Sequence, residues 1–245
     1  MIGHPGAGIA AGLRTVRHVS GQRDPPMRST IISILLLLIL ASVVFLGCTT
    51  GVEPSPSPGL LRVAIKGVET DTSIVILGDS SQFSRWDNFY VFVGQGRIYK
   101  GDNYSAIYAN ASSDRKTTDT ANILGREWLN GTPITTADTT TITPQNSRYR
   151  QYVVFESNVP PGTYDRLYFG LTANVMEIFI PKHYRNPVQL PPGEIPGIDF
   201  TGTFTVEQDR VTQINLEIYP FESLTRYKDS YYFSRKMYVA SVQVQ

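Results

Sequence analysis

The stretch Ile198–Ile218, IDFTGTFTVEQDRVTQINLEI, decides the fold of this chain of 245 residues. Apolar side chains occupy alternate positions on both sides of the polar segment Glu207–Arg210. They are Ile198, Phe200, Phe204 and Val206 before it and Ile214, Leu216 and Ile218 after it. Such alternation turns one face of a strand toward a core and the other toward water. The stretch therefore predicts two β-strands of a sheet that is wet on one side.

The same alternation recurs elsewhere between residues 60 and 245. It is found at Leu61, Val63 and Ile65, and again at Leu167, Phe169 and Leu171. Strands that are wet on one face are typical of antiparallel sheets, and two such sheets bury their apolar faces by stacking. We therefore expect an all-β chain in which residues 60–245 form a single antiparallel β-sandwich.

Local signals mark the connections. Pro160-Pro161-Gly162 predicts a tight turn, and Gly94-Gln95-Gly96 predicts the turn of a hairpin. Ser and Thr dominate residues 109–147, which we expect to be a surface excursion with a short helix near Asp119 and Thr120. Five prolines in Pro181–Gly197 predict a structured loop instead of a central strand.

Two stretches carry a resemblance to a known family. They are VPPGTYDRLYFGLT, Val159–Thr172, and IDFTGTFTVEQDRVTQINLEIYPFESL, Ile198–Leu224. In both, the chain resembles the domain of unknown function 4382 family of secreted, often lipid-anchored archaeal and bacterial proteins. The resemblance covers residues 60–245 and implies a Greek-key β-sandwich, transthyretin-like or immunoglobulin-like, on the cell surface. It implies no reaction and no catalytic residue.

The front of the chain has the features of an export signal. Thr30–Gly47 is an uncharged run of 18 residues that follows Met27-Arg28 and ends at Cys48, the only cysteine. This length lies at the border between a signal peptide and a transmembrane helix. Phe45-Leu46-Gly47-Cys48 resembles a lipobox, at which lipoprotein precursors are cut before the cysteine is lipidated. The alternative is an unmodified Cys48 at the end of an uncleaved anchor helix.

These features divide the chain into four segments. Residues 1–26 either precede a true start at Met27 or form a disordered extension, and residues 27–47 are a signal peptide or hydrophobic anchor helix. Residues 48–59 contain the lipidated Cys48 and a Ser/Pro linker, and residues 60–245 form the β-sandwich domain. Both alternatives for Cys48 place the domain outside the cytoplasmic membrane and anchor it to the cell surface.

The charge balance argues against a nucleic-acid partner. The chain has 22 basic and 21 acidic residues. Four of the basic residues, all arginines, and one of the acidic residues, an aspartate, precede Cys48. The rest is therefore slightly acidic, whereas nucleic-acid phosphates require a clustered basic face. We expect the membrane, an envelope protein or a glycan as partner instead.

The residues that carry chemistry are few. Beyond Cys48 there is one histidine and no cysteine, which excludes Cys–His catalysis and zinc sites made of several such ligands. We expect no catalytic residue, no metal site and no cofactor. The ligand-binding candidates are Trp86, His183, Tyr184 and Arg185, and the N-x-[ST] glycosylation candidates are Asn103, Asn110 and Asn130.

The sequence thus predicts a membrane-anchored cell-surface protein that is not an enzyme. The first hypothesis is a module for envelope assembly, adhesion or protein interaction. The alternative is a carbohydrate or small-ligand binding module that uses the Pro181–Gly197 loop and its aromatic residues. A hydrolase is the third hypothesis.

Overall fold

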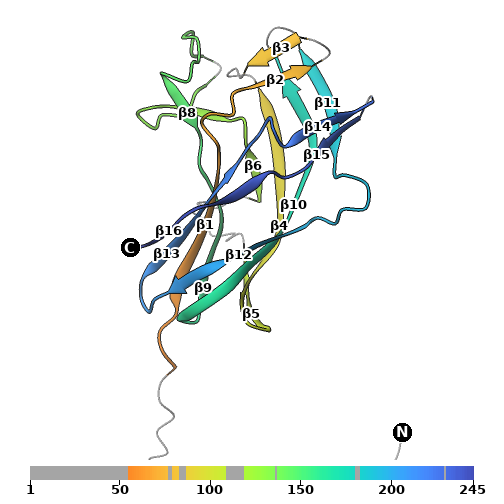
Figure 1. Ribbon diagram of the computed structural model, residues 1–245. Helices are drawn as coiled ribbons and strands as arrows, with labels where there is room; N and C mark the ends of the chain where they lie inside the picture. The colour runs from red at the N-terminus through yellow and green to blue at the C-terminus, as the bar shows by residue number, and fades with distance from the viewer. Residues whose placement is uncertain are drawn as a thin grey trace, which may run out of the picture. The chain divides into compact units, whose positions relative to one another are not determined.

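The computed structural model describes residues 55–76, 79–82, 87–108, 119–135, 137–179, 183–228 and 230–245. The described residues contain sixteen strands and no helix, which confirms the all-β prediction (Figure 1). The chain divides into two units, and the strands belong to the second, Pro56–Gln245. The predicted hydrophobic helix over 27–47 lies outside the described residues. Within those residues, no helix has the length and apolar composition to span a membrane.

One principal sheet has four strands in the order β16-β13-β1-β9. Its members are β1 (Gly59–Gly67), β9 (Tyr152–Val159), β13 (Val211–Ile218) and β16 (Met237–Val244). β1, β13 and β16 run side by side in Figure 1. β1 is antiparallel to β9 but parallel to β13. Because strands distant in sequence meet here, this sheet depends on contacts between the two ends of the domain.

The other principal sheet has eight strands. Six follow the order β14-β15-β11-β10-β4-β5, while β12 pairs with β10 and β6 pairs with β4. Its strands are β4 (Asn88–Lys100), β5 (Asn103–Ile107), β6 (Thr120–Asn122), β10 (Gly162–Ile178), β11 (Tyr184–Gln189), β12 (Gly197–Val206), β14 (Leu224–Tyr227) and β15 (Ser230–Phe233). Two separate hairpins are β2 (Ser73–Ile76) with β3 (Asp79–Gln82), and β7 (Arg126–Trp128) with β8 (Ser147–Tyr149).

The expectation of purely antiparallel sheets is wrong. β1 pairs with β13 in parallel, and so does β11 with β15, so both principal sheets are mixed. The alternation of apolar side chains is the same in parallel and antiparallel strands that are wet on one face. The sequence pattern therefore indicates which face is buried but not the direction of the neighbouring strand.

One core joins the two principal sheets. The side chains at Leu61, Val63, Ile65, Ile214 and Leu216 from one sheet, and at Leu167, Phe169, Leu171 and Phe204 from the other, are fully buried in a single cluster. Phe169 of β10 meets Phe155 of β9 edge-on at 5.6 Å between ring centroids and stacks on Phe200 of β12 at 5.7 Å. Aromatic contacts therefore bridge the sheets at their centre.

Gly94-Gln95-Gly96 is not a hairpin turn, because β4 continues through it. The pairing of β4 with β10 shifts register at this point, where Phe169 lies opposite Gly96 and Leu171 opposite Val93. A Cβ atom on Gly94 would lie 3.4 Å from the Cα of Gly170 on the neighbouring strand. The glycines thus permit a close approach of two backbones at a bulge, which is a second common role of glycine in strands.

The predicted short helix near Asp119 and Thr120 is also wrong. Thr120–Asn122 forms β6 on β4, and Arg126–Trp128 forms β7 on β8. An isolated helix of this length gains too few hydrogen bonds to stand alone, whereas the edge of β4 offers partners at once. Tertiary pairing therefore overrides the local capping signal.

The proline-rich segment Pro181–Gly197 contains a strand that the sequence argued against. β11 pairs with β10 through Tyr184 to Pro187, and its pairing with β15 on the other side begins at Val188. Pro187 has no N–H to donate, and it lies where the pairing of β11 with β10 ends and the pairing of β11 with β15 begins. The staggered pairing explains how a proline is accommodated between two strands.

The remainder of this segment is the structured loop that was expected. The Arg235 guanidinium donates to the carbonyl oxygens of Ile195, Pro196 and Gly197 at 2.8, 3.1 and 3.3 Å, and it also pairs with the Glu194 carboxylate. One arginine thus satisfies three consecutive carbonyl groups and ties the loop to the segment that follows β15.

The predicted turn at Pro160-Pro161-Gly162 joins β9 to β10, so it passes from one principal sheet to the other. The Tyr164 hydroxyl at the start of β10 donates to the carbonyl oxygen of Pro160 at 2.6 Å. This bond reaches back four residues across the connection and fixes the angle at which the chain enters the second sheet.

Candidate functional site

A row of tyrosine and arginine side chains crosses the eight-stranded sheet on the face opposite its core. We call it the tyrosine–arginine ladder; it consists of Tyr104 of β5, Arg97 and Tyr99 of β4, Arg166 and Tyr168 of β10, and Asp199 of β12. Tyr99 lies directly opposite Tyr104 on one side and Arg166 on the other. Arg97 lies opposite Tyr168, so the two residue types alternate between neighbouring strands.

The ladder is held together by ring and cation contacts. The Arg166 guanidinium carbon lies 3.8 Å from the Tyr99 ring centroid, and that of Arg97 lies 4.7 Å from the Tyr104 centroid. The Tyr99 and Tyr104 rings are 5.6 Å apart, and Arg166 pairs with Asp199 at 3.8 Å. Cation–π contacts of this kind orient long side chains that would otherwise be mobile. Even so, Tyr104 remains 54% exposed.

The backbone around the ladder is built to present it. The Asp165 carboxylate accepts a 2.7 Å hydrogen bond from the Gly101 N–H and so ties the turn between β4 and β5 to β10. A Cβ atom on Gly197 would come within 2.3 Å of the Tyr168 hydroxyl oxygen. Gly197 is therefore required for Tyr168 to lie flat against β12.

A polar groove of about 270 Å³ lies on the outer face of the four-stranded sheet. We call it the amide groove; it is lined by Lys66, Gln151, Gln213, Asn215, Leu216, Glu217, Ala240, Ser241 and Gln243. The Asn215 carbonyl oxygen accepts hydrogen bonds from Gln151 at 2.9 Å and Gln213 at 2.7 Å. The Asn215 amide group donates to the Ser241 hydroxyl oxygen at 2.9 Å. Asn215 is thus the centre of the groove.

A bulge in β16 opens the groove. Ser241 pairs with Asn215 and Val239 with Leu216, so Ala240 has no partner in the pairing of β16 with β13. An extra residue in one strand bends it locally and re-aims the side chains beside it. The small side chains of Ala240 and Ser241 then leave space above β13.

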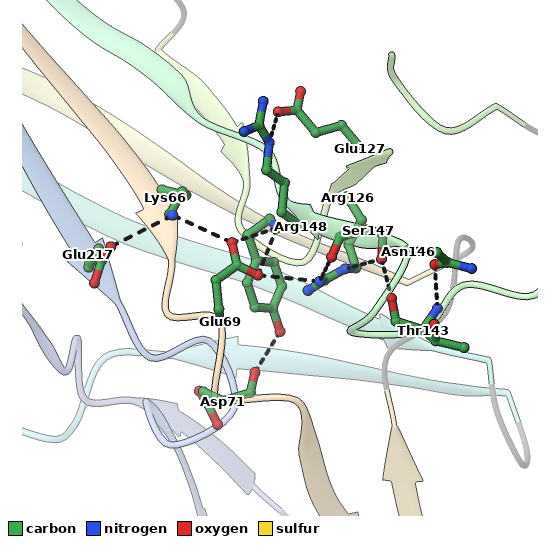
Figure 2. Close-up of polar contacts among 11 residues, drawn as sticks. Lys66, Glu69, Asp71, Arg126, Glu127, Thr143, Asn146, Ser147, Arg148 and Glu217 are labelled. Carbon is green, nitrogen blue, oxygen red and sulfur yellow. Dashed lines mark hydrogen bonds and ion pairs between the residues drawn. The ribbon is translucent and has the colours of Figure 1, made fainter. Parts of the chain in front are cut away.

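The charges in the groove balance. Lys66 lies 3.8 Å from Glu217 and 3.5 Å from Glu69. Glu217 also accepts a 2.6 Å hydrogen bond from the Tyr238 hydroxyl, and this bond raises the pKa of Tyr238 to about 12. Figure 2 shows Lys66 between the two carboxylates. Among the residues that line the groove, Lys66 and Glu217 cancel each other in charge, and the remaining polar side chains are neutral.

Behind the groove, Glu69 connects it to a buried arginine. Arg126 has a side chain that is 1% exposed; it pairs with Glu69 at 3.3 Å and donates to the Ser147 hydroxyl and carbonyl oxygens at 2.9 and 2.8 Å (Figure 2). Its guanidinium carbon also lies 4.3 Å from the Tyr149 ring centroid. Burial lowers the pKa of Arg126, but these partners keep the group cationic.

Asp71 anchors the same region from the other side. Its carboxylate accepts hydrogen bonds from the N–H groups of Phe221 at 2.8 Å and Glu222 at 3.1 Å, and its carbonyl oxygen accepts one from the Tyr149 hydroxyl at 2.6 Å. Burial raises the pKa of Asp71 above its ordinary 3.8, although the bonds from Glu222 and Phe221 oppose the shift. The ionised carboxylate is therefore less favoured in the folded than in the unfolded chain.

This shift predicts a pH dependence of stability. Because the pKa of Asp71 is higher in the folded than in the unfolded chain, protonated Asp71 stabilises the folded state. This stabilisation is complete below about pH 3.8 and is lost as the pH rises through the pKa of the folded state. We expect the free energy of unfolding of the wild type, relative to Asp71→Asn, to fall across that interval. Urea denaturation of both proteins at a series of pH values measures it, and a difference that is constant or rises with pH would contradict the assignment.

Three of the four predicted ligand-binding residues, His183, Tyr184 and Arg185, lie in the described part of the chain, and none of these three lines the amide groove. The His183 ring stacks on Phe179 at 4.2 Å, and Arg185 pairs with Glu177 at 3.1 Å from a largely exposed side chain. Tyr184 is half-buried at the start of β11, and Trp86 lies outside the described residues. His183, Tyr184 and Arg185 belong neither to the ladder nor to the lining of the amide groove, and ligand binding by these residues and by Trp86 stays a prediction.

The predicted modification sites are only partly described. Asn103 is exposed at the start of β5, and Asn130 is exposed in the turn after β7, where its side-chain oxygen accepts a 3.0 Å bond from the Thr132 N–H. Asn110 and Cys48 lie outside the described residues. Glycosylation and lipidation of these residues stay predictions.

Sequence reasoning missed the ladder, although a signal was present. Arg97-Ile98-Tyr99 and Arg166-Leu167-Tyr168 are both arginine–apolar–tyrosine triplets. In a strand whose central residue is buried, the two flanking residues share the outer face. Two such triplets on neighbouring strands would have indicated an ordered outer face. The amide groove had no comparable signal, because a bulge determines it.

Within the described ranges, no three His, Cys, Asp or Glu residues gather as a metal site would require. Comparison with known proteins finds no matching family model, no matching curated protein and no matching solved structure.

Proposed function

We propose that this chain is a non-catalytic cell-surface module whose tyrosine–arginine ladder binds another protein. It is anchored to the membrane through a lipid on Cys48 or through an uncleaved helix over 27–47, and the Ser/Pro linker holds the domain away from the headgroups. The observation that supports the binding role is an ordered but exposed aromatic and cationic face on a rigid sheet.

We propose further that the two principal sheets form a Greek-key β-sandwich, transthyretin-like or immunoglobulin-like, as in the domain of unknown function 4382 family. The Tyr164 bond to Pro160 supports this architecture. A tyrosine whose hydroxyl reaches back a few residues at the crossover between sheets recurs in sandwiches of this kind.

The ladder suits a protein partner because of its composition and shape. Tyrosine and arginine are enriched at the energetic centres of protein interfaces, since both give a large contact area and directed polar contacts. The contacts among Arg97, Arg166 and the tyrosines reduce the side-chain entropy that binding would otherwise cost. A partner that presents carboxylates beside apolar surface matches Arg97 and Arg166.

The carboxylates of the domain support binding better than catalysis. Asp165 is bonded to Gly101, Asp199 is paired with Arg166, and Glu217 is bonded to Tyr238. Each of these acidic groups is thus committed to a structural contact on a different strand. A hydrolytic pair would need two carboxyl groups converging on one substrate.

The proposal predicts that removing an aromatic side chain of the ladder strongly weakens binding of the chain to its protein partner. We expect Tyr104→Ser to weaken binding of the full chain to envelope proteins by about 30-fold, the size of an interface hot spot of about 2 kcal/mol. Biolayer interferometry with immobilised full chain and detergent-solubilised envelope measures it. Tyr227→Ser is the matched control, because Tyr227 is 63% exposed and lies on β14, away from the ladder.

A parallel measurement uses envelope extract digested with a protease. Digestion should abolish binding if the partner is a protein. Binding that survives digestion, or equal affinities for the Tyr104→Ser and Tyr227→Ser variants, would contradict the proposal.

A further inference from the structure

We propose that the amide groove is a second binding site, independent of the ladder, and that it takes one neutral sugar residue of a glycan. The groove lies on the outer face of the four-stranded sheet, whereas the ladder crosses the outer face of the eight-stranded sheet. Its volume of about 270 Å³ is just below the range of about 300 to 1,000 Å³ in which drug-sized ligands bind. It therefore fits a single small polar unit and not an extended chain.

The groove supplies donors and acceptors in the mixture that sugar hydroxyls require. Each glutamine side chain has two N–H donors and one carbonyl acceptor, and Gln151 and Gln213 each donate to Asn215 through the amide nitrogen. In the described part of the chain, the side-chain carbonyls of these glutamines accept no hydrogen bond from the protein. The Ser241 hydroxyl accepts from Asn215, which leaves its own hydrogen to donate. A hydroxyl group both donates and accepts, so it can satisfy these groups together.

Asn122 provides a comparison for Asn215, because its side chain has a structural role. Asn122 also borders a hollow, of about 260 Å³, but its oxygen accepts from the N–H groups of Phe89 and Leu124. Its nitrogen donates to the side chain of Asn88 at 2.9 Å. The Asn122 side-chain oxygen thus accepts from backbone N–H groups, whereas the Asn215 side chain bonds only to side chains that line the groove. The Asn215 network therefore holds in place the side chains that line the groove.

Charge and apolar contacts narrow the ligand class. The two charged residues that line the groove, Lys66 and Glu217, have opposite charges and lie 3.8 Å apart, so an acidic sugar gains no net attraction. Ala240 is exposed and provides a small apolar surface among the lining residues, against which the C–H face of a sugar ring can pack. Tyr238, 40% exposed, is held beside the groove by its bond to Glu217 and adds a ring for stacking.

Saturation-transfer NMR on the full chain in phospholipid nanodiscs tests the inference. The probes are the methyl glycosides of glucose, galactose, mannose and N-acetylglucosamine, with methyl glucuronide as the charged comparison. We expect at least one neutral glycoside to bind with a millimolar dissociation constant. The double variant Gln151→Ala/Gln213→Ala should weaken it by about 30-fold, because two hydrogen bonds of about 1 kcal/mol each are lost.

Two control variants make the outcome decisive. Gln208→Ala, an exposed glutamine in the turn between β12 and β13, should leave glycoside binding unchanged. Tyr104→Ser should also leave it unchanged, which separates this site from the ladder. The inference is overturned if none of the four neutral glycosides shows transfer at about 50 mM, well above the millimolar range expected for such contacts. Binding of the glucuronide alone, or unaltered binding by the double variant with native circular dichroism, would overturn it as well.

Discussion

Replacing Phe169 by alanine is expected to lower the free energy of unfolding by about 4 kcal/mol. Phe169 is fully buried and touches aromatic rings from both principal sheets, Phe155 at 5.6 Å and Phe200 at 5.7 Å. The substitution removes a large apolar side chain and leaves a cavity that rigid strands cannot close. It also removes two aromatic contacts, each of which contributes about 1 kcal/mol beyond the buried area.

The matched control for this prediction is Phe92→Ala. Phe92 lies on β4 of the same sheet but on its outer face, where it is 42% exposed. We expect that substitution to cost less than about 1 kcal/mol. Urea denaturation followed by tryptophan fluorescence measures both variants. If Phe169→Ala and Phe92→Ala cost the same, the sheets do not share the core described above.

Replacing Arg126 by methionine is expected to cost about 3 kcal/mol. The guanidinium is almost fully buried and donates to the Ser147 hydroxyl and carbonyl oxygens, in addition to its pair with Glu69. Methionine fills part of the volume but leaves the Ser147 carbonyl without this charged donor. The contact with the Tyr149 ring is also lost. We therefore expect loosening of the β7–β8 hairpin, which amide hydrogen exchange at Tyr149 would detect.

Arg148→Met provides the comparison on the neighbouring position. The Arg148 side chain is 47% exposed and pairs with Glu127 at 2.8 Å. Exposed ion pairs contribute at most about 1 kcal/mol, so this variant should remain close to the wild type. Equal losses of stability for Arg126→Met and Arg148→Met would show that burial of Arg126 has no energetic consequence.

The buried faces of the strands could be predicted from the sequence. Alternation at Leu61 to Ile65 and at Ile214 to Ile218 correctly indicates which side chains enter the core, because a period of two is a local property of a strand. Strand direction could not be predicted in this way. The parallel pairing of β1 with β13 joins residues about 150 positions apart, and nothing local records it.

Sequence signals for turns and strand ends gave wrong predictions where contacts with a neighbouring strand determine the local structure. Gly94 and Gly96 resemble a turn in sequence, but they serve the close approach of β4 to β10. Pro187 resembles a strand breaker, but it falls at the junction of two staggered ladders. In both cases the residue has the expected conformational property, and only the neighbouring strand decides how that property is used.

The candidate sites also differ in whether local sequence could indicate them. The sequence predicts His183, Tyr184 and Arg185 as ligand contacts because aromatic and charged residues in a proline-rich loop are typical of binding loops, and this stays a prediction. The ladder instead arises from strands β5, β4, β10 and β12, whose order only the folded sheet provides. The amide groove depends on a bulge at Ala240, which no local pattern in β16 indicates.

Photo-crosslinking in living cells tests the central claim most directly. A benzoylphenylalanine at position 104, where Tyr104 is 54% exposed, is compared with one at position 227 on β14, where Tyr227 is 63% exposed. The account predicts a discrete adduct with one envelope protein at position 104, reduced when Arg97→Ala is added, and no such adduct at position 227. The same adducts from both positions, or none from position 104, would contradict it.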